Sequence, residues 1–180
     1  MVGALVLAVG GCSGSGSDQP KVLPPVPSAT VAVTATPTTT AVPVVVPSAA
    51  VPATPQGAAA FVRFFYGELN GAFQDGNAQR IRVLSDPGCA TCNNYANATD
   101  ASAKARYRII GDSFSSLQIA AAAPNNSVTL VTVLGRIPSR HVSDKGVVTK
   151  LPSDGPFATT VAVQRHGNHW LIRAIQFDKS

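Results

Sequence analysis

Apolar side chains recur every three or four positions between residues 55 and 74, a spacing that places them on one face of an α-helix. This predicted face consists of Phe61, Phe64, Phe65, Leu69, Ala72 and Phe73. Thr54 can cap the helix, and Pro55 suits its first turn. The segment 75–77 reads Asp-Gly-Asn and favours a turn, so we expect the helix to end there.

Two further helices are predicted before residue 105. Ala78, Ile81 and Leu84 have the spacing of a short helix, with Arg80 and Arg82 pointing outward. Residues 85–88, Ser-Asp-Pro-Gly, then favour a turn. Residues 91–104 predict a third helix that is polar and only weakly amphipathic.

Beyond Ala105 the pattern changes to short runs rich in β-branched residues, separated by Pro, Gly, Asn or Asp. Such runs predict strands. We expect strands over 107–110, 116–121, 128–137, 141–149, 157–165 and 170–177, with a hairpin loop at 166–169. Helices followed by antiparallel strands predict an α+β fold in which the helices pack on a curved antiparallel sheet.

Residues 1–12 resemble the start of a bacterial lipoprotein. The first eleven residues are uncharged and apolar, which is too short for a membrane-spanning helix but fits a signal peptide. The run Val-Gly-Gly-Cys that ends at Cys12 resembles a lipobox, whose cysteine receives a diacylglycerol. An accidental apolar start with a free cysteine is the alternative. No Lys or Arg precedes the run, so we expect the natural translation start to lie upstream.

Residues 12–54 are expected to form a disordered, lipid-anchored linker rich in Pro, Thr and Ala. From residue 13 onward this segment contains eight prolines and no aromatic residue. Proline removes backbone hydrogen-bond donors and interrupts any helical or alternating pattern of apolar residues. We therefore predict an extended, disordered chain here. A Pro-rich ligand for a recognition domain is the alternative. The predicted organisation is therefore a signal peptide over 1–11, the linker over 12–54 and a folded domain over 55–180.

The formal net charge of +5 belongs to the predicted domain, because residues 55–180 hold 13 of the 14 Lys and Arg and 8 of the 9 Asp and Glu. A basic face could meet anionic lipid headgroups or wall polymers, or could simply be solvated surface. Six arginines contribute much of the positive charge of the domain: Arg80, Arg82, Arg106, Arg108, Arg136 and Arg140. We expect no nucleic-acid partner for a domain outside the membrane.

Three segments resemble an actinobacterial lipoprotein family of unknown function, of the mycobacterial type. They are Pro55-Gln-Gly-Ala-Ala-Ala-Phe-Val-Arg, Leu84-Ser-Asp-Pro-Gly-Cys-Ala-Thr-Cys92 and the hairpin His169-Trp-Leu-Ile-Arg-Ala-Ile. The resemblance covers residues 55–180 and implies a cone-shaped fold similar to that of nuclear transport factor 2. That superfamily includes isomerases and dehydratases as well as binding modules without catalysis, so the fold alone does not fix the function.

The two cysteines of the predicted domain, Cys89 and Cys92, are the most specific part of this resemblance. If Cys12 is acylated, they are the remaining pair in an oxidising compartment, and a disulfide is the simplest outcome. A thiol-redox role and a metal site remain alternatives.

The interior of the cone is the candidate ligand site. The candidate lining residues are Phe61, Phe64, Phe65, Tyr107 and Trp170, although such aromatic residues are more often core. An isomerase-type site would need a cavity carboxylate, for which Asp112 beside Tyr107 or Tyr66 is the candidate.

The three histidines suggest no site. We expect His166 and His169 to be exposed beside the hairpin turn, and His141 has no evident carboxylate partner. We assign no catalytic residue, metal site or cofactor.

Together these observations predict an extracytoplasmic lipoprotein, anchored in the cell membrane by its lipid. Its domain would bind a small apolar ligand or an envelope protein without catalysis. The alternatives are an isomerase or dehydratase that uses a carboxylate in the cavity, and a structural interaction domain whose core is filled. The oligomeric state is left open.

Overall fold

The computed structural model describes residues 43–125 and 127–178, which lie in one compact unit spanning Thr39–Ser180. The predicted signal peptide, Cys12 and most of the predicted linker lie outside the described residues. None of the helices in the described part is long and apolar enough to cross a bilayer.

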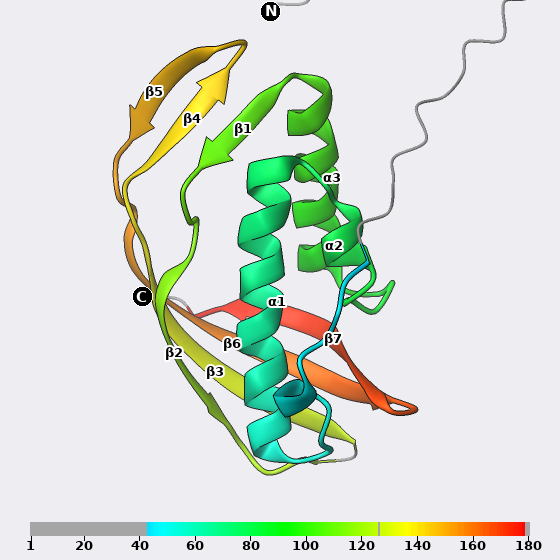
Figure 1. Ribbon diagram of the computed structural model, residues 1–180. Helices are drawn as coiled ribbons and strands as arrows, with labels where there is room; N and C mark the ends of the chain where they lie inside the picture. Colours follow the sequence, from blue (N-terminus) through cyan, green and yellow to red (C-terminus); the bar gives the residue numbers. More distant parts are fainter. Residues whose placement is uncertain (1–42, 126, 179–180) are drawn as a thin grey trace, which may run out of the picture. The chain divides into compact units, whose positions relative to one another are not determined.

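Within residues 43–178, three α-helices and one short 3-10 helix precede the strands, in agreement with the predicted order (Figure 1). Thr54 caps the long helix, since its hydroxyl oxygen accepts a hydrogen bond of 3.1 Å from the Gly57 amide, and Gly76 ends it in the left-handed conformation. The bounds are η1 Ser48–Ala50, α1 Pro55–Asp75, α2 Gln79–Arg82 and α3 Ala90–Lys104.

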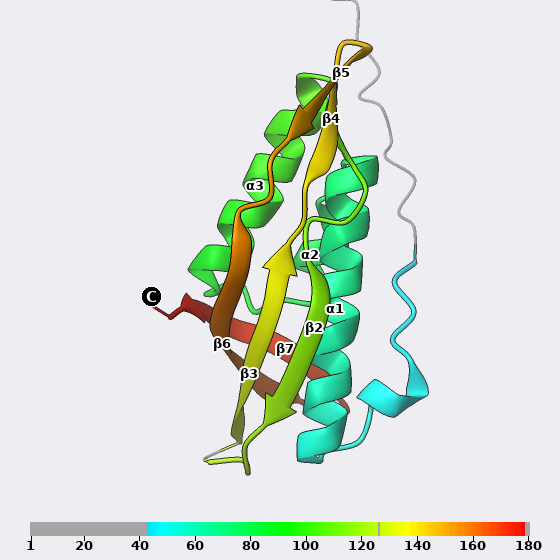
Figure 2. The ribbon, with the colours of Figure 1, turned by 90° about the vertical axis from the view of Figure 1, so that its left-hand side faces the viewer.

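The strands form two antiparallel sheets. The larger sheet has the order β2-β3-β6-β7 and the smaller the order β1-β4-β5. In the larger sheet the strands are β2 Ser115–Ala121, β3 Val128–Ile137, β6 Gly155–His166 and β7 His169–Phe177. In the smaller sheet they are β1 Tyr107–Ile110, β4 Arg140–Asp144 and β5 Val147–Leu151. Helices on one side of curved antiparallel sheets confirm the predicted α+β class (Figures 1 and 2).

The single strand predicted over 141–149 is wrong, because the chain turns back on itself inside this segment. β4 and β5 pair as a hairpin in which Asp144 lies opposite Val147. The two residues between them, Lys145 and Gly146, both have positive φ, at 50° and 90°. Two positive φ values in a two-residue loop are typical of the hairpin turns that follow the twist of the strands, and glycine favours them.

The core lies between α1 and the larger sheet. The helix buries Phe61, Phe65 and Leu69 completely or almost completely, while Phe64 and Phe73 are only half-buried. In the central strands β3 and β6, alternate residues point toward the helix. These inward residues include Val131, Val133, Val161 and Val163, none of which is exposed.

Residues 43–54, which we call the strap, pack on the folded domain although the sequence assigned them to a disordered linker. Ala50 is buried, and Val44 and Val46 contact the core. Two carbonyl groups of the strap accept hydrogen bonds from the β6–β7 hairpin. Trp170 Nε1 donates to the Pro52 oxygen at 3.1 Å. Arg165 Nη1 donates in the same way to the Val51 oxygen. The ordered structure therefore begins before residue 55, and the predicted boundary is corrected.

Candidate ligand-binding pocket

A pocket of about 200 Å³ lies between the C-terminal end of α1, the middle of α3 and strand β1. The helix α1 contributes Phe73 and its cap Gly76, and β1 contributes Tyr107 and Ile109, which are two residues apart and share one face. From α3 come Ala98, Thr99 and Ser102, whose spacing places them along one side of the helix.

The pocket exists because small residues stand where larger ones would fill the space. Ala98, Thr99 and Ser102 bring only short side chains to the wall formed by α3. At the end of α1, Gly76 has a φ of 75°, and an added Cβ would lie 2.7 Å from the guanidinium carbon of Arg108. The positive φ favours glycine at this helix end, and the Arg108 guanidinium packs over the helix terminus.

The lining of this pocket consists of uncharged side chains, mostly apolar. The Thr99 hydroxyl is already engaged, since it donates a hydrogen bond of 2.8 Å to the Tyr95 carbonyl oxygen. Ser102 and Tyr107 also line an adjoining, more open hollow, together with Asp144 and Lys145 of the β4–β5 hairpin. The pocket thus offers an apolar interior beside a polar surface.

An aromatic cluster supports the pocket from inside. The Phe73 ring meets the Tyr95 ring edge to face at 5.9 Å, and Phe114 lies against Tyr66 at 5.2 Å and Phe157 at 5.5 Å. Burial raises the pKa of both Tyr66 and Tyr95 above the ordinary tyrosine value. The hydroxyl groups of Tyr66 and Thr159 hydrogen-bond to each other at 3.1 Å, so the Tyr66 phenol is part of the core.

Asn70 joins α1 to the chain that leads into β2. Its Oδ1 accepts hydrogen bonds of 3.0 Å from the amides of Ser113 and Phe114, and its Nδ2 donates to the Phe114 carbonyl oxygen at 2.9 Å. Because Phe114 belongs to the aromatic cluster, this buried amide positions the residues beneath the pocket.

Among the five predicted cavity residues, Tyr107 lines this pocket. Phe61, Phe65 and Trp170 are instead buried in the core, and Phe64 packs against that core. The phenylalanines stand nearer the middle of α1 and pack in the core, whereas the pocket lies at the C-terminal end of that helix.

Asp112, the candidate carboxylate of the isomerase alternative, does not line the pocket, and the carboxylate opposite Tyr107 is Asp144 of β4. Asp112 is exposed, and its Oδ1 accepts a hydrogen bond of 3.3 Å from Gln74. Tyr66 is buried in the core against Thr159. His141, His166 and His169 are all exposed.

Cys89 and Cys92 form the predicted disulfide, with a distance of 5.3 Å between their Cα atoms. Both residues are buried, and Cys89 also caps α3 because its sulfur accepts a hydrogen bond from the Cys92 amide at 3.2 Å. The bond therefore fixes the start of the helix that forms one wall of the pocket. The described residues contain no cluster of three or more His, Cys, Asp or Glu that could hold a metal ion.

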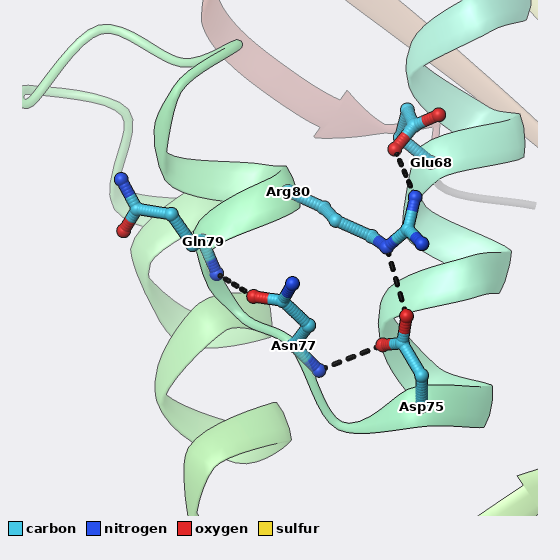
Figure 3. Close-up of polar contacts among 5 residues, drawn as sticks. All are labelled: Glu68, Asp75, Asn77, Gln79 and Arg80. Atoms are coloured by element: carbon cyan, nitrogen blue, oxygen red, sulfur yellow. Dashed lines mark hydrogen bonds and ion pairs between the residues drawn. The ribbon is translucent and has the colours of Figure 1, made fainter. Parts of the chain in front are cut away.

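A polar cluster holds α2 against α1 (Figure 3). The Arg80 guanidinium lies between two carboxylates, at 2.7 Å from Glu68 Oε2 and 2.9 Å from Asp75 Oδ2. The hydrogen bond that Arg80 donates to Glu68 is the main cause that raises the pKa of Arg80. The prediction that Arg80 points outward is wrong, since its side chain is 22% exposed, whereas Arg82 is exposed and pairs with Asp100.

Several residues of the site were not found by sequence reasoning. Tyr95 and Phe114 escaped attention because each stands alone among polar or small neighbours. The spacing of Ala98 and Ser102 on one side of a predicted helix was the available signal, since two small residues on one helical side allow close approach or leave a gap.

Comparisons with known proteins identify a family and a fold. A family model described as "Family of unknown function (DUF6318)" matches residues 31–176. No curated protein sequence matches the chain significantly. Among solved structures, the intermembrane space region of the chloroplast protein ARC6 is 14% identical, with 70% of this chain and 97% of that chain covered and a TM-score of 0.52.

Two further structures are similar at lower TM-scores. An NTF2-like protein of unknown function from Pseudomonas putida KT2440 is 12% identical, with 71% of this chain and 89% of that chain covered and a TM-score of 0.43. A structure described as "Putative calcium/calmodulin dependent protein kinase II association domain" from Xanthomonas campestris is 10% identical, with 69% of this chain and 86% of that chain covered and a TM-score of 0.42. At such identities a structural match describes the fold and not the activity.

Proposed function

The chain belongs to this family of unknown function, DUF6318, and from that premise we propose that it is a membrane-anchored lipoprotein whose domain binds a small apolar ligand without catalysis. The observation that carries the binding role is the pocket between α1, α3 and β1, with its uncharged lining. Binding sites for small molecules are typically concave and mostly apolar, with a few polar groups that orient the ligand.

The size and chemistry of the pocket limit the ligand. Its volume of about 200 Å³ is close to that of an engineered apolar cavity of about 150 Å³ that binds benzene. The ligand class that fits is therefore one ring or a short branched alkyl group. The hydroxyl groups of Ser102 and Tyr107, which lie between the pocket and the adjoining hollow, suit a ligand with one polar end directed outward.

We propose from the side chains that line the pocket that the domain binds its ligand without catalysis. General acid–base catalysis needs an ionisable group within hydrogen-bond reach of the reacting atom. The pocket lining holds no carboxylate or histidine. Its one ionisable side chain is the Tyr107 phenol, Asp144 lines only the adjoining hollow, and Asp112 hydrogen-bonds to Gln74 on an exposed part of the surface.

The anchoring role is proposed from the sequence, where Cys12 follows an apolar run in a lipobox-like context. Intact-mass analysis of the chain extracted from the membranes of its own host tests this role. We expect a mature chain that starts at Cys12 and carries the added mass of a diacylglycerol. A chain that retains the residues before Cys12 with an unmodified thiol would contradict the anchoring.

Native mass spectrometry of the chain purified from its own host tests the binding role. We expect a retained small molecule that is released on unfolding. The variant Ser102→Trp fills the pocket and should lose this molecule, whereas Asn94→Trp, on an exposed part of α3, should keep it. Equal retention by both variants, or a wild-type chain without a ligand, would contradict the proposal.

A further inference from the structure

The strap is held by two neighbouring donors on the β6–β7 hairpin. Arg165 of β6 lies opposite Trp170 of β7, and its guanidinium carbon is 5.3 Å from the centre of the Trp170 ring. Their hydrogen bonds go to successive carbonyl oxygens, those of Val51 and Pro52. Such bonds require a backbone carbonyl at each place but no particular side chain. We call the surface that the strap covers, with Gly57, Arg165 and Trp170, the strap site.

The strap also fits the domain through one small side chain. Ala50 is 2% exposed and belongs to the core, whereas Pro47, Ser48 and Ala49 are exposed. A hydrogen bond of 2.9 Å from the Ala50 amide to the Pro47 carbonyl oxygen closes the turn of η1, which packs against α1 (Figure 1). Val46, just before this turn, is half-buried against the core. The strap site therefore accepts an apolar residue, a turn and a small residue in that order.

The sequence of the strap occurs a second time, twenty residues upstream. Residues 46–51 read Val-Pro-Ser-Ala-Ala-Val, and residues 26–31 read Val-Pro-Ser-Ala-Thr-Val. Between residues 18 and 54 serine occurs only in these two segments, so the general content of Pro, Thr and Ala does not account for the match. We call residues 26–31 the upstream segment, and it lies outside the described residues.

The upstream segment offers the groups that the strap site uses. The carbonyl groups of Val31 and Ala32 correspond to the two that accept hydrogen bonds from the hairpin. No residue between 22 and 54 is charged, so neither segment would bring a charge to a buried surface. The one difference within the repeat is Thr30 in place of Ala50, which is a larger and polar side chain at a buried position. The upstream segment is therefore the weaker of two competitors for one site.

The length of the chain allows this exchange within one molecule. If the upstream segment takes the place of residues 46–51, residues 32–54 become the loop that leads back to the first turn of α1. The entropic cost of closing a loop rises only slowly with its length. Because both segments belong to one chain, the upstream segment competes at an effective concentration on the order of millimolar.

We propose that the strap site binds either Val-Pro-Ser-Ala segment of this chain, and that the upstream segment takes the place of the strap when the strap leaves. The exchange moves the point at which the chain joins the domain by twenty residues. In a chain anchored at Cys12, it shortens the segment between the anchor and the domain to residues 13–25 and draws the domain toward the membrane. The exchange itself requires neither the anchor nor a ligand in the pocket.

Acrylamide quenching of tryptophan fluorescence tests the exchange on the purified full chain. Trp170 is the only tryptophan and is 4% exposed where the strap binds, so its accessibility reports whether the strap site is covered. Ala50→Asp places a carboxylate at a buried position and should release the strap. We expect Trp170 to stay nearly as shielded as in the wild type, because the upstream segment replaces the strap. The double variant Ala50→Asp, Thr30→Asp blocks both segments and should raise the quenching constant several-fold.

Two controls carry the same substitution. Ala49→Asp changes an exposed position of the strap, Thr30→Asp alone leaves the strap intact, and both should match the wild type. A melting curve shows whether each variant remains folded, and the same pair of substitutions to asparagine replaces any aspartate variant that does not fold.

Three results would overturn the proposal. In the first, the single variant at Ala50 is quenched as strongly as the double variant, so the upstream segment does not bind. In the second, the double variant stays as shielded as the wild type, so these segments do not determine the cover of Trp170. In the third, the shielding in the single variant is lost on dilution, so the covering segment comes from a second copy.

Discussion

Asn70 is a buried polar residue of α1 that holds the backbone beneath the pocket in position. Its side chain satisfies two backbone amides and one carbonyl of Ser113 and Phe114. Asn70→Ala should lower the free energy of unfolding by about 3 kcal/mol, since buried donors and acceptors lose their partner. Urea denaturation measures the loss, with Asn94→Ala, an exposed change on α3, as the control. Equal stability of the two variants would contradict the role given to Asn70.

Tyr66 and Tyr95 predict a loss of stability at high pH. Burial raises the pKa of both phenols in the folded chain, while the unfolded chain titrates near the ordinary value of about 10. Below about pH 10 both states bind the phenol protons equally. Above it the unfolded state releases them first, so the free energy of unfolding falls by up to about 1.4 kcal/mol per pH unit for each tyrosine.

Urea denaturation between about pH 8 and pH 11 measures this slope. The double variant Tyr66→Phe, Tyr95→Phe should be less stable at pH 8, because the hydrogen bond to Thr159 is lost, but should show a flatter dependence above pH 10. An unchanged slope in the double variant would mean that other groups cause the alkaline loss.

At the scale of the elements, the strap and α1 approach so closely that a side chain cannot fit between them. A Cβ at Gly57 would lie 2.1 Å from the carbonyl oxygen of Pro52, whereas a Cβ at Gly67 meets nothing within 4 Å. Both glycines lie on α1, so alanine at either position raises helix propensity by up to about 1 kcal/mol.

Gly67→Ala should therefore stabilise the chain by up to about 1 kcal/mol, and Gly57→Ala should destabilise it because the strap must move away. Thermal denaturation of the two variants compares them directly. If Gly57→Ala were stabilised as much as Gly67→Ala, the strap would not be held against the helix in solution.

The disulfide is expected to contribute about 2 kcal/mol to the free energy of unfolding, since it closes a loop of only four residues in the unfolded chain. The double variant Cys89→Ser, Cys92→Ser should lose this amount in urea denaturation. A variant with unchanged stability would contradict the stabilising role given to the disulfide.

The elements that were predicted well are those stabilised by residues close to one another in the sequence. The long helix α1 has a clear apolar period and recognisable caps at Thr54 and Gly76. The strap could not be predicted, because Val44, Val46 and Ala50 lie in a proline-rich segment without a period. Its order comes from distant partners, since Trp170 binds it through a backbone carbonyl.

The candidate site was predicted less well than the fold for a related reason. Its walls depend on small side chains such as Ala98 and Ser102, which carry no hydrophobic signal in a polar helix. The large aromatic residues that drew attention, such as Phe61 and Phe65, fill the core because they face the sheet. Tyr107 was identified because an aromatic residue at the start of a predicted strand is visible in the sequence.

At the scale of the whole molecule, the proposed lipid anchor, the strap and the pocket are separate features of one chain. The proposed anchor lies in the sequence before the domain, and the strap joins the domain at the start of α1 (Figure 1). The pocket lies at the other end of α1, on the side of the larger sheet that carries the helices.

The central claim is that the pocket between α1, α3 and β1 takes a small apolar molecule. A titration of the isotope-labelled full chain with benzene, followed through backbone amide signals by NMR, tests it most directly. We predict saturable shifts at Phe73, Thr99 and Ile109, and their loss in Ser102→Trp but not in Asn94→Trp. Signals at these three positions that do not respond to benzene, or that respond equally in both variants, would contradict the claim.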